Sequence, residues 1–261
     1  MCSFLIFKIE SYIPMITLYA TCIIDQFLPE VGESVFYLLE KTGEKIYYPD
    51  TITCCGLPHF NNGYQDEAAE VLKKQIDSLE GEGPIVVPSG SCCWMLKNVL
   101  PTLFTDQPHI YEKAVKVSKR VIELTQFLRK IGLLEKKNLL PGKTTYHDSC
   151  HLLRGLGESE SPRECLETTC EEVVELEDSD RCCGFGGSFC MKFPEISSEM
   201  LDQKIEKIES SEADWIVAAD AGCILQIASG LERRKSSSKI LHIAQALVGP
   251  GKPGWPKEEK S

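Results

Sequence analysis

The chain has 261 residues and a formal net charge of −11 at pH 7, from 39 acidic and 28 basic side chains. This balance disfavours nucleic acids and anionic membrane surfaces as partners, because both attract basic patches. Thirteen cysteines, an odd number clustered near glycines, favour metal binding in a reducing compartment over a disulfide framework, so we expect a cytoplasmic protein.

The first half of the chain alternates predicted strands and helices. Residues 1–14 lack a basic leader and a cleavage site, so we expect a loose N-terminal extension and no signal peptide. Apolar runs and helical periodicity then predict strands at 15–21, 46–48 and 84–88, and helices at 29–41, 64–79 and 111–130. No run reaches the ~18 apolar residues of a transmembrane helix, so we expect no membrane span.

The second half repeats this order after a candidate linker at 136–143. Strands are expected at 144–147, 173–176, 215–219 and 239–242, and helices from about 162 and at 195–209 and 224–231. This alternation predicts an α/β fold with two tandem pseudo-symmetric units, each a small parallel sheet flanked by helices. The expected boundaries are an extension (1–14), a first repeat (15–135), a second repeat (143–248) and a disordered tail (249–261).

Two loops with adjacent cysteines define the internal repeat. Cys54 and Cys55 precede Gly56, and Cys182 and Cys183 precede Gly184, at an offset of 128 residues. In both copies another cysteine comes 31 intervening residues before the pair, and a fourth follows an apolar run and a small-residue turn. The matched sets are Cys22, Cys54, Cys55 and Cys92 in the first copy, and Cys150, Cys182, Cys183 and Cys223 in the second.

Glycines accompany the paired cysteines for a steric reason. Successive side chains of an extended backbone point to opposite faces, so two neighbouring thiolates meet one centre only where the chain kinks. Gly56 and Gly184 can adopt the positive φ that such a kink needs. Gly186 and Gly187 let bare backbone approach a ligand, with N–H groups free to bond sulfur. We therefore predict that these four glycines help to bind a cofactor.

Each set of four thiolates suits either zinc or an iron-sulfur cluster, and the number of thiolates does not separate the two. Structural zinc sites usually contain C-x2-C pairs, and this sequence has none. The first and last cysteines of each set follow predicted strands, and parallel sheets bind ligands at this edge. We expect iron-sulfur clusters, with zinc as the alternative.

Four segments resemble the cysteine-rich CCG-domain family, whose members include one subunit of heterodisulfide reductase and the iron-sulfur subunit of glycolate oxidase. The resemblance covers about residues 15–248, and its motifs are residues 88–92, 146–155, 182–187 and 222–223. It implies [4Fe-4S] clusters and an electron-transfer role in a complex that oxidises L-lactate to pyruvate. The partners it implies are a ferredoxin-like iron-sulfur protein and a third subunit.

Other functions stay open at this point. The resemblance is also compatible with cluster-based thiol-disulfide chemistry, with glycolate as the electron donor, or with a zinc-stabilised scaffold. In the reductase pattern each motif closes with a C-x2-C pair, whereas Ser89 and Asp220 occupy the first position of that pair here. This departure favours four-cysteine ligation over the five-cysteine noncubane cluster of the reductase.

The remaining cysteines and two histidines carry weaker signals. We expect Cys93 and Cys190 to pack, with a fifth-ligand role as the alternative, and Cys165 and Cys170 to be structural residues of a helix. His147 and His151 flank Cys150, where imidazole can ligate metal or hydrogen-bond a cluster sulfur; we expect the hydrogen bond.

Overall fold

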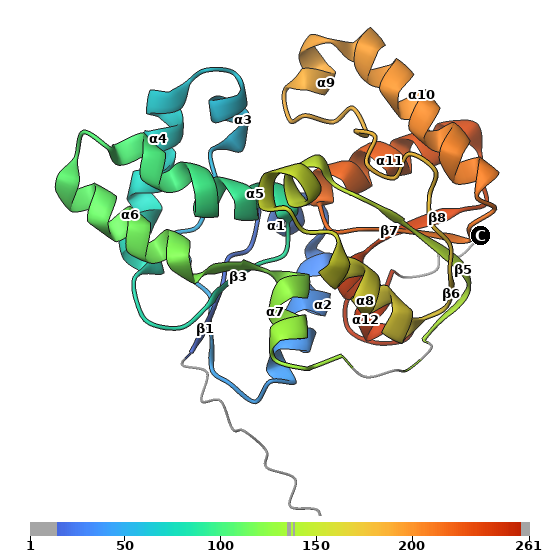
Figure 1. Cartoon of the computed structure of the whole chain (residues 1–261), viewed down its shortest axis with the longest axis horizontal. Coiled ribbons are helices and arrows are strands. Elements are labelled where there is room, and N and C mark those ends of the chain that lie inside the picture. The colour runs from blue at the N-terminus through green and yellow to red at the C-terminus, as the bar shows by residue number, and fades with distance from the viewer. Residues whose placement is uncertain (1–14, 135–136, 138, 257–261) are drawn as a thin grey trace, which may run out of the picture.

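Short aliphatic runs form two parallel sheets with the same strand order. The computed structural model describes residues 15–134, 137 and 139–256, so the predicted extension at 1–14 lies outside the described residues. The first sheet has the order β2-β1-β3-β4 and the second the order β6-β5-β7-β8. Figure 1 labels β1 and β3 of the first sheet and all four strands of the second. The α/β fold with two pseudo-symmetric tandem units is therefore confirmed.

The strands are short, and each sheet is covered by helices on both faces. The first sheet contains β1 (Ile16–Leu18), β2 (Ile46–Tyr47), β3 (Ile85–Val87) and β4 (Val121–Glu123). The second contains β5 (Leu140–His147), β6 (Cys170–Val173), β7 (Trp215–Ala218) and β8 (Lys239–His242). Alternating residues face opposite layers, so Val86 packs with α2 and α7 while Ile85 packs with α4 and α6.

The helical segments follow the same repeat. Those of the first unit are α1 (Cys22–Phe27), α2 (Pro29–Glu40), α3 (Leu57–Asn61), α4 (Gln65–Ile76), η1 (Asp77–Leu79), α5 (Gly90–Trp94), η2 (Met95–Val99), η3 (Leu100–Phe104), α6 (Pro108–Arg120) and α7 (Leu124–Lys130). Those of the second unit are η4 (His151–Gly155), α8 (Glu160–Thr169), α9 (Phe189–Lys192), α10 (Pro194–Ser210), α11 (Ala221–Arg234) and α12 (Ile243–Val248). No helix among the described residues has both the length and the apolar character needed to cross a membrane.

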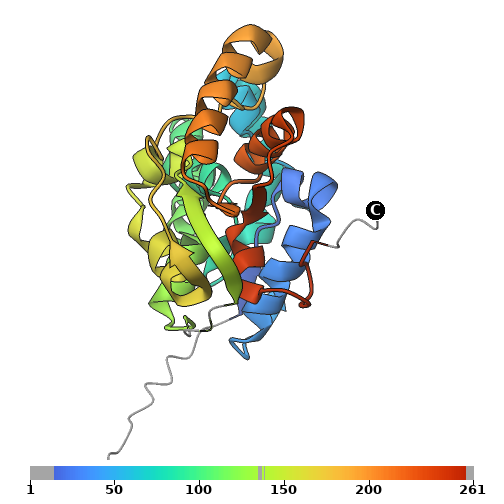
Figure 2. The same cartoon turned by 90° about the vertical axis from the view of Figure 1, so that its right-hand side faces the viewer.

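The two units pack against each other reciprocally. The last helix of the first unit, α7, packs on α8 of the second, and the last helix of the second unit, α12, packs on α2 of the first. Figure 2 shows the second of these contacts, where the red C-terminal segment lies beside the blue helices. Two further reciprocal contacts, α5 with η4 and α1 with α11, join the cysteine-bearing segments. The pseudo-twofold arrangement therefore brings the cysteine-bearing edges of both sheets to one place.

Three predicted boundaries need correction. The helix predicted at 111–130 is interrupted by β4, because Val121–Glu123 pairs with β3 before α7 begins. The second sheet starts at Leu140, inside the predicted linker, where β5 pairs with β6. The strand predicted at 173–176 is β6, and it covers residues 170–173. Cys170 therefore begins a strand and does not belong to a helix.

The tail is ordered up to residue 256, contrary to the prediction for 249–261. The carbonyl of Pro253 accepts a hydrogen bond from Ser34 Oγ at 3.2 Å, and that of Gly254 accepts one from Gln245 Nε2 at 2.9 Å. Trp255 packs edge-on against Trp215, with ring centroids 5.8 Å apart. These contacts outweigh the prolines and charges that predicted disorder. The last five residues of the predicted tail lie outside the described residues.

His242 joins the two units and begins α12. Its Nδ1 accepts a hydrogen bond from the backbone N–H of Ala244 at 3.1 Å, so Nε2 carries the proton and donates to the carbonyl of Pro88, 3.1 Å away. Burial lowers the pKa of His242 to about 4. A second proton on the ring would break the helix cap.

Between pH 7 and pH 5, the His242→Gln variant should lose less stability than the wild-type chain. Wild-type His242 stays neutral in the folded state, whereas the unfolded chain binds a proton below about pH 6.5. The stability that His242 contributes is thus lost as pH falls from about 6.5 to 4, and its share between pH 7 and 5 is about 2 kcal/mol. Urea unfolding at both pH values measures the difference, and equal pH dependence in both proteins would contradict this assignment.

Candidate metal centre

The first set of cysteines comes from three segments at the carboxyl edge of the first sheet. Cys22 begins α1 after β1, Cys54 and Cys55 lie in the loop between β2 and α3, and Cys92 lies in α5 after β3. Their thiols interact in sequence, Cys22 with Cys54, Cys54 with Cys55, and Cys55 with Cys92. The fold thus brings together all four side chains of the first predicted set.

The second set reproduces this arrangement. Cys150 follows β5 and directly precedes η4, the paired cysteines lie between β6 and α9, and Cys223 lies in the first turn of α11. Interactions again run from Cys150 to Cys182, from Cys182 to Cys183, and from Cys183 to Cys223. Two copies with the same order of contacts indicate a shared requirement for four converging sulfurs.

Each set contains one thiol that ionises readily and neighbours that do not. The thiols of Cys22 and Cys55 donate toward Cys54 and lower its pKa, helped by the N–H of Gly56 at 3.4 Å from its sulfur. The same interactions, together with burial, raise the pKa of Cys22 and of Cys55. The pKa of Cys182 is lowered in the same way by its own neighbours. Without a metal cation, the lowered pKa therefore favours a thiolate at Cys54 and at Cys182, and a bound cation would favour ionisation of the thiols that bind it.

Both sets border a single cavity. Its volume is about 90 Å³, and all eight predicted cysteines line it. The helix that carries Cys92 contacts η4 next to Cys150, and the helix that carries Cys223 contacts α1, which begins at Cys22. The interlocked units therefore place two sets of donors around one space.

Unsatisfied hydroxyls support a ligand in this cavity. Thr21 and Ser149 directly precede Cys22 and Cys150, line the cavity and are buried. Neither side-chain oxygen has a hydrogen-bond partner among the described residues. Buried polar groups are rarely left unpaired, so these matched oxygens fit a site that takes a polar or ionic group. The donor chemistry of the two thiol sets fits an iron-sulfur cluster or zinc.

The predicted glycines contribute in two ways. Gly56 and Gly184 have φ values of +78° and +86°, and each directs its N–H to the sulfur two residues earlier, at 3.4 Å. Gly186 and Gly187 also have positive φ and line the cavity itself. The former pair shapes the cysteine loops, while the latter pair leaves backbone exposed to the space between the two sets.

A hydrogen-bonded pair occupies the positions where the reductase pattern has extra cysteines. Asp220 Oδ2 accepts from Ser89 Oγ at 3.0 Å and from the N–H of Ser91 at 2.9 Å, while Oδ1 accepts from the N–H of Gly222 at 3.2 Å. One carboxylate thus joins the N-termini of α5 and α11. The sequence identified Ser89 and Asp220 only as departures, because equivalent positions in two repeats give no sign that they meet.

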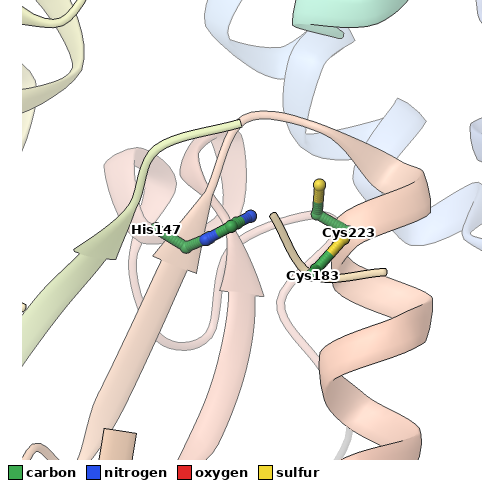
Figure 3. Close-up of side chains that lie close together, drawn as sticks. All are labelled: His147, Cys183 and Cys223. Carbon is green, nitrogen blue, oxygen red and sulfur yellow. The ribbon is translucent and has the colours of Figure 1, made fainter. Parts of the chain in front are cut away.

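Two histidines lie near the second set. His151 lines the cavity, with its Nδ1 3.5 Å from Cys150 Sγ and its ring 5.0 Å from that of Trp94. His147 is buried, and one of its nitrogens and the sulfurs of Cys183 and Cys223 all lie within 4.8 Å of one another (Figure 3). Burial lowers the pKa of His147 to about 4, so its ring is neutral.

The remaining cysteines of the described chain do not line the cavity. Cys93 is buried in the first core, and Cys165 is buried in α8 within the second unit. Cys170 begins β6, and the thiol of Cys190 donates to the carbonyl of Gly187 at 3.2 Å.

Comparisons with known proteins follow the same division of the chain. The family described as "Cysteine-rich domain" (CCG) matches residues 16–97 and 144–228. Lactate utilization protein A of Geobacillus thermodenitrificans is 41% identical over 234 residues, covering 89% of this chain and 98% of that protein. Lactate utilization protein A 2 of Bacillus cereus strain Q1 is 39% identical over 235 residues, which cover 89% of this chain and 97% of that protein.

Among solved structures, a hypothetical protein from Helicobacter pylori has a similar fold. The TM-score is 0.61 at 12% sequence identity, over 91% of this chain and 49% of that one. The chain therefore spans about half the length of that structure, and the likeness concerns the fold alone.

Proposed function

The chain belongs to the lactate utilization protein A family and contains the cysteine-rich CCG domain twice, and from this premise we propose that it is an iron-sulfur electron-transfer subunit of a system that oxidises L-lactate to pyruvate. The observation that carries the proposal is the convergence of two matched four-thiol sets on one cavity. Thiolate-bound iron-sulfur clusters supply one-electron chemistry at potentials set by hydrogen bonds, charge and burial.

In this proposal the residues of the chain have separate tasks. The eight cysteines Cys22, Cys54, Cys55, Cys92, Cys150, Cys182, Cys183 and Cys223 provide the ligands. Gly56 and Gly184 direct N–H groups to sulfur, which stabilises negative charge there. Asp220 fixes the two cysteine-bearing helix ends relative to each other. We infer [4Fe-4S] clusters, because four thiolates are available in each set.

The proposal includes two partners, a ferredoxin-like iron-sulfur protein and a third subunit of the lactate utilization system. It also includes a cytoplasmic location, because cysteines that bind a metal centre stay reduced in a reducing compartment.

A second candidate function is cluster-based thiol-disulfide chemistry. The observation that favours it is the cavity itself, which is lined mainly by apolar atoms and sulfur between the two thiol sets, including Leu57, Pro58 and Phe185. Such a lining would accept a small disulfide. A glycolate-oxidising system is a further variant of the first proposal, with a different donor.

Complementation of growth on L-lactate tests the proposed function. In a bacterium that lacks its own lactate utilization protein A, the wild-type chain and Cys165→Ser should restore growth, and Cys183→Ser should not. Cys165 is a matched control because it undergoes the same exchange at a buried position away from the cavity. Growth with Cys183→Ser would contradict the proposal. Rescue on glycolate and not on L-lactate would favour the other donor, and lactate-independent disulfide reduction by the purified protein would favour the second candidate.

A further inference from the structure

The two thiol sets differ at one matched position. At the offset of 128 residues that relates Cys22 to Cys150, Tyr19 corresponds to His147. Tyr19 directly follows β1, and His147 is the last residue of β5. Both residues are buried. The repeat thus places a phenol beside one set of cysteines and an imidazole beside the other.

Tyr19 satisfies its polar atom within the first unit. Its hydroxyl donates to Gln75 Oε1 at 3.0 Å, and Gln75 Nε2 in turn donates to the carbonyl of Cys54 at 2.9 Å. The phenol therefore stabilises the cysteine loop through an amide and has no need of a ligand.

His147 has no such partner. Only 1% of its surface is exposed, and neither Nδ1 nor Nε2 has a hydrogen-bond partner among the described residues. A buried polar group without a partner destabilises the fold, because it has lost its hydrogen bonds to water and gained none in their place. Figure 3 shows the ring directed from the end of β5 toward Cys183 and Cys223.

We propose that His147 is a direct ligand of the metal centre of the second unit, as a fifth donor in addition to the four thiolates, of which those of Cys183 and Cys223 lie beside it. A single metal bonded to nitrogen at ~2.0–2.1 Å and to sulfur at ~2.3 Å keeps a nitrogen and a sulfur within ~4.4 Å of each other and two sulfurs within ~4.6 Å. One nitrogen of His147 and both sulfurs lie within 4.8 Å of one another, and no nitrogen of the ring forms a hydrogen bond with a sulfur. The inference rests on the proposed function, in that the second unit binds a metal centre.

The consequence is that the two centres of the chain are not equivalent. The first has thiolate donors alone, whereas the second gains a neutral imidazole, and histidine ligation raises the potential of iron-sulfur centres. A buried cation acts in the same direction. Lys204 is buried, and its Nζ donates to the carbonyls of Asp178 and Ser179 in the loop before Cys182. The second centre should therefore have the higher reduction potential.

Pulsed electron paramagnetic resonance of the full chain, loaded anaerobically with iron and sulfide and then reduced, tests this ligand. We expect a nitrogen coupling of the size given by direct coordination, and we expect it to change when histidine is supplied as the ¹⁵N isotope. The labelling uses the wild-type chain, so its result does not depend on the folding of a variant. His147→Phe should abolish the coupling, whereas Tyr19→Phe, the change at the matched position, should keep it.

A redox titration provides the second readout. His147→Phe should lower the potential of one centre only, and Tyr19→Phe should leave the difference between the centres in place. Absence of a histidine coupling from an iron-sulfur-loaded protein, or its loss only in His151→Phe, would overturn the ligand while leaving the proposed function intact. A protein that binds neither iron nor sulfide would overturn the proposed function and the ligand together.

Discussion

A Cys183→Ser variant is expected to lose the metal centre of the second unit and to keep that of the first. Serine replaces a soft thiolate by a hard and poorly ionised hydroxyl, and iron-sulfur centres select the thiolate. Cys183 is also one of the two inner thiols of the set, since it interacts with both Cys182 and Cys223. Its replacement therefore interrupts the set and does more than remove one donor.

Iron, sulfide and visible absorption per chain measure this effect. All three should fall to about half in Cys183→Ser, because each set of four thiols is proposed to bind a cluster of its own. Cys55→Ser should give the mirror result, with the first centre lost, and Cys165→Ser should retain both. Full iron and sulfide content in Cys183→Ser would show that Cys183 is not a ligand, and complete loss in either variant would show that the two centres depend on each other.

The second large effect is expected for Gly184→Ala. Gly184 has a φ of +86°, and a Cβ atom there would lie 2.7 Å from the backbone oxygen of Ser197 and 3.2 Å from Met200 Cβ. The positive φ costs a side chain roughly 1–2 kcal/mol, and the added overlap in a packed region costs about 1–3 kcal/mol more. We expect a loss of stability of about 2–5 kcal/mol together with loss of the second centre.

Gly132→Ala is the matched control for this variant. Gly132 also has a positive φ, +67°, but a Cβ atom there would meet nothing within 4 Å. It should therefore show the conformational cost alone and keep both centres. Denaturant unfolding of the two variants compares them directly. Equal destabilisation would mean that α10 moves easily away from Gly184, and the close fit of the cysteine loop would then not matter for the centre.

The sequence predicts the repeated part of the fold better than its boundaries. The prediction missed β4 because Val121–Glu123 has helix-compatible residues on both sides and becomes a strand only by pairing with β3. The sequence nevertheless contained a signal for this strand. The segment 121–128 aligns with 240–247, where a strand was predicted. In this alignment Glu123, which caps α7, matches His242, which caps α12.

For the candidate site, too, the sequence predicts the features that are repeated better than the contacts between the two repeats. Cysteine spacing predicted that the members of each set come together, because each first and last cysteine follows a strand of a parallel sheet. The spacing could not show that both sets border one cavity, since this depends on the reciprocal packing of α5 with η4 and of α1 with α11. Nor could it show the hydrogen bond from Ser89 to Asp220, or that the Tyr19 hydroxyl has a hydrogen-bond partner whereas the His147 ring has none among the described residues. These features are tertiary contacts between segments that are remote in the sequence.

Metal and sulfide analysis of protein purified without oxygen tests the central claim, which is that the two thiol sets bind iron-sulfur clusters. The account predicts bound iron together with acid-labile sulfide, visible absorption that bleaches on reduction, and a paramagnetic signal from the reduced protein. Stoichiometric zinc without sulfide would contradict it and would make the paired units a zinc-stabilised scaffold.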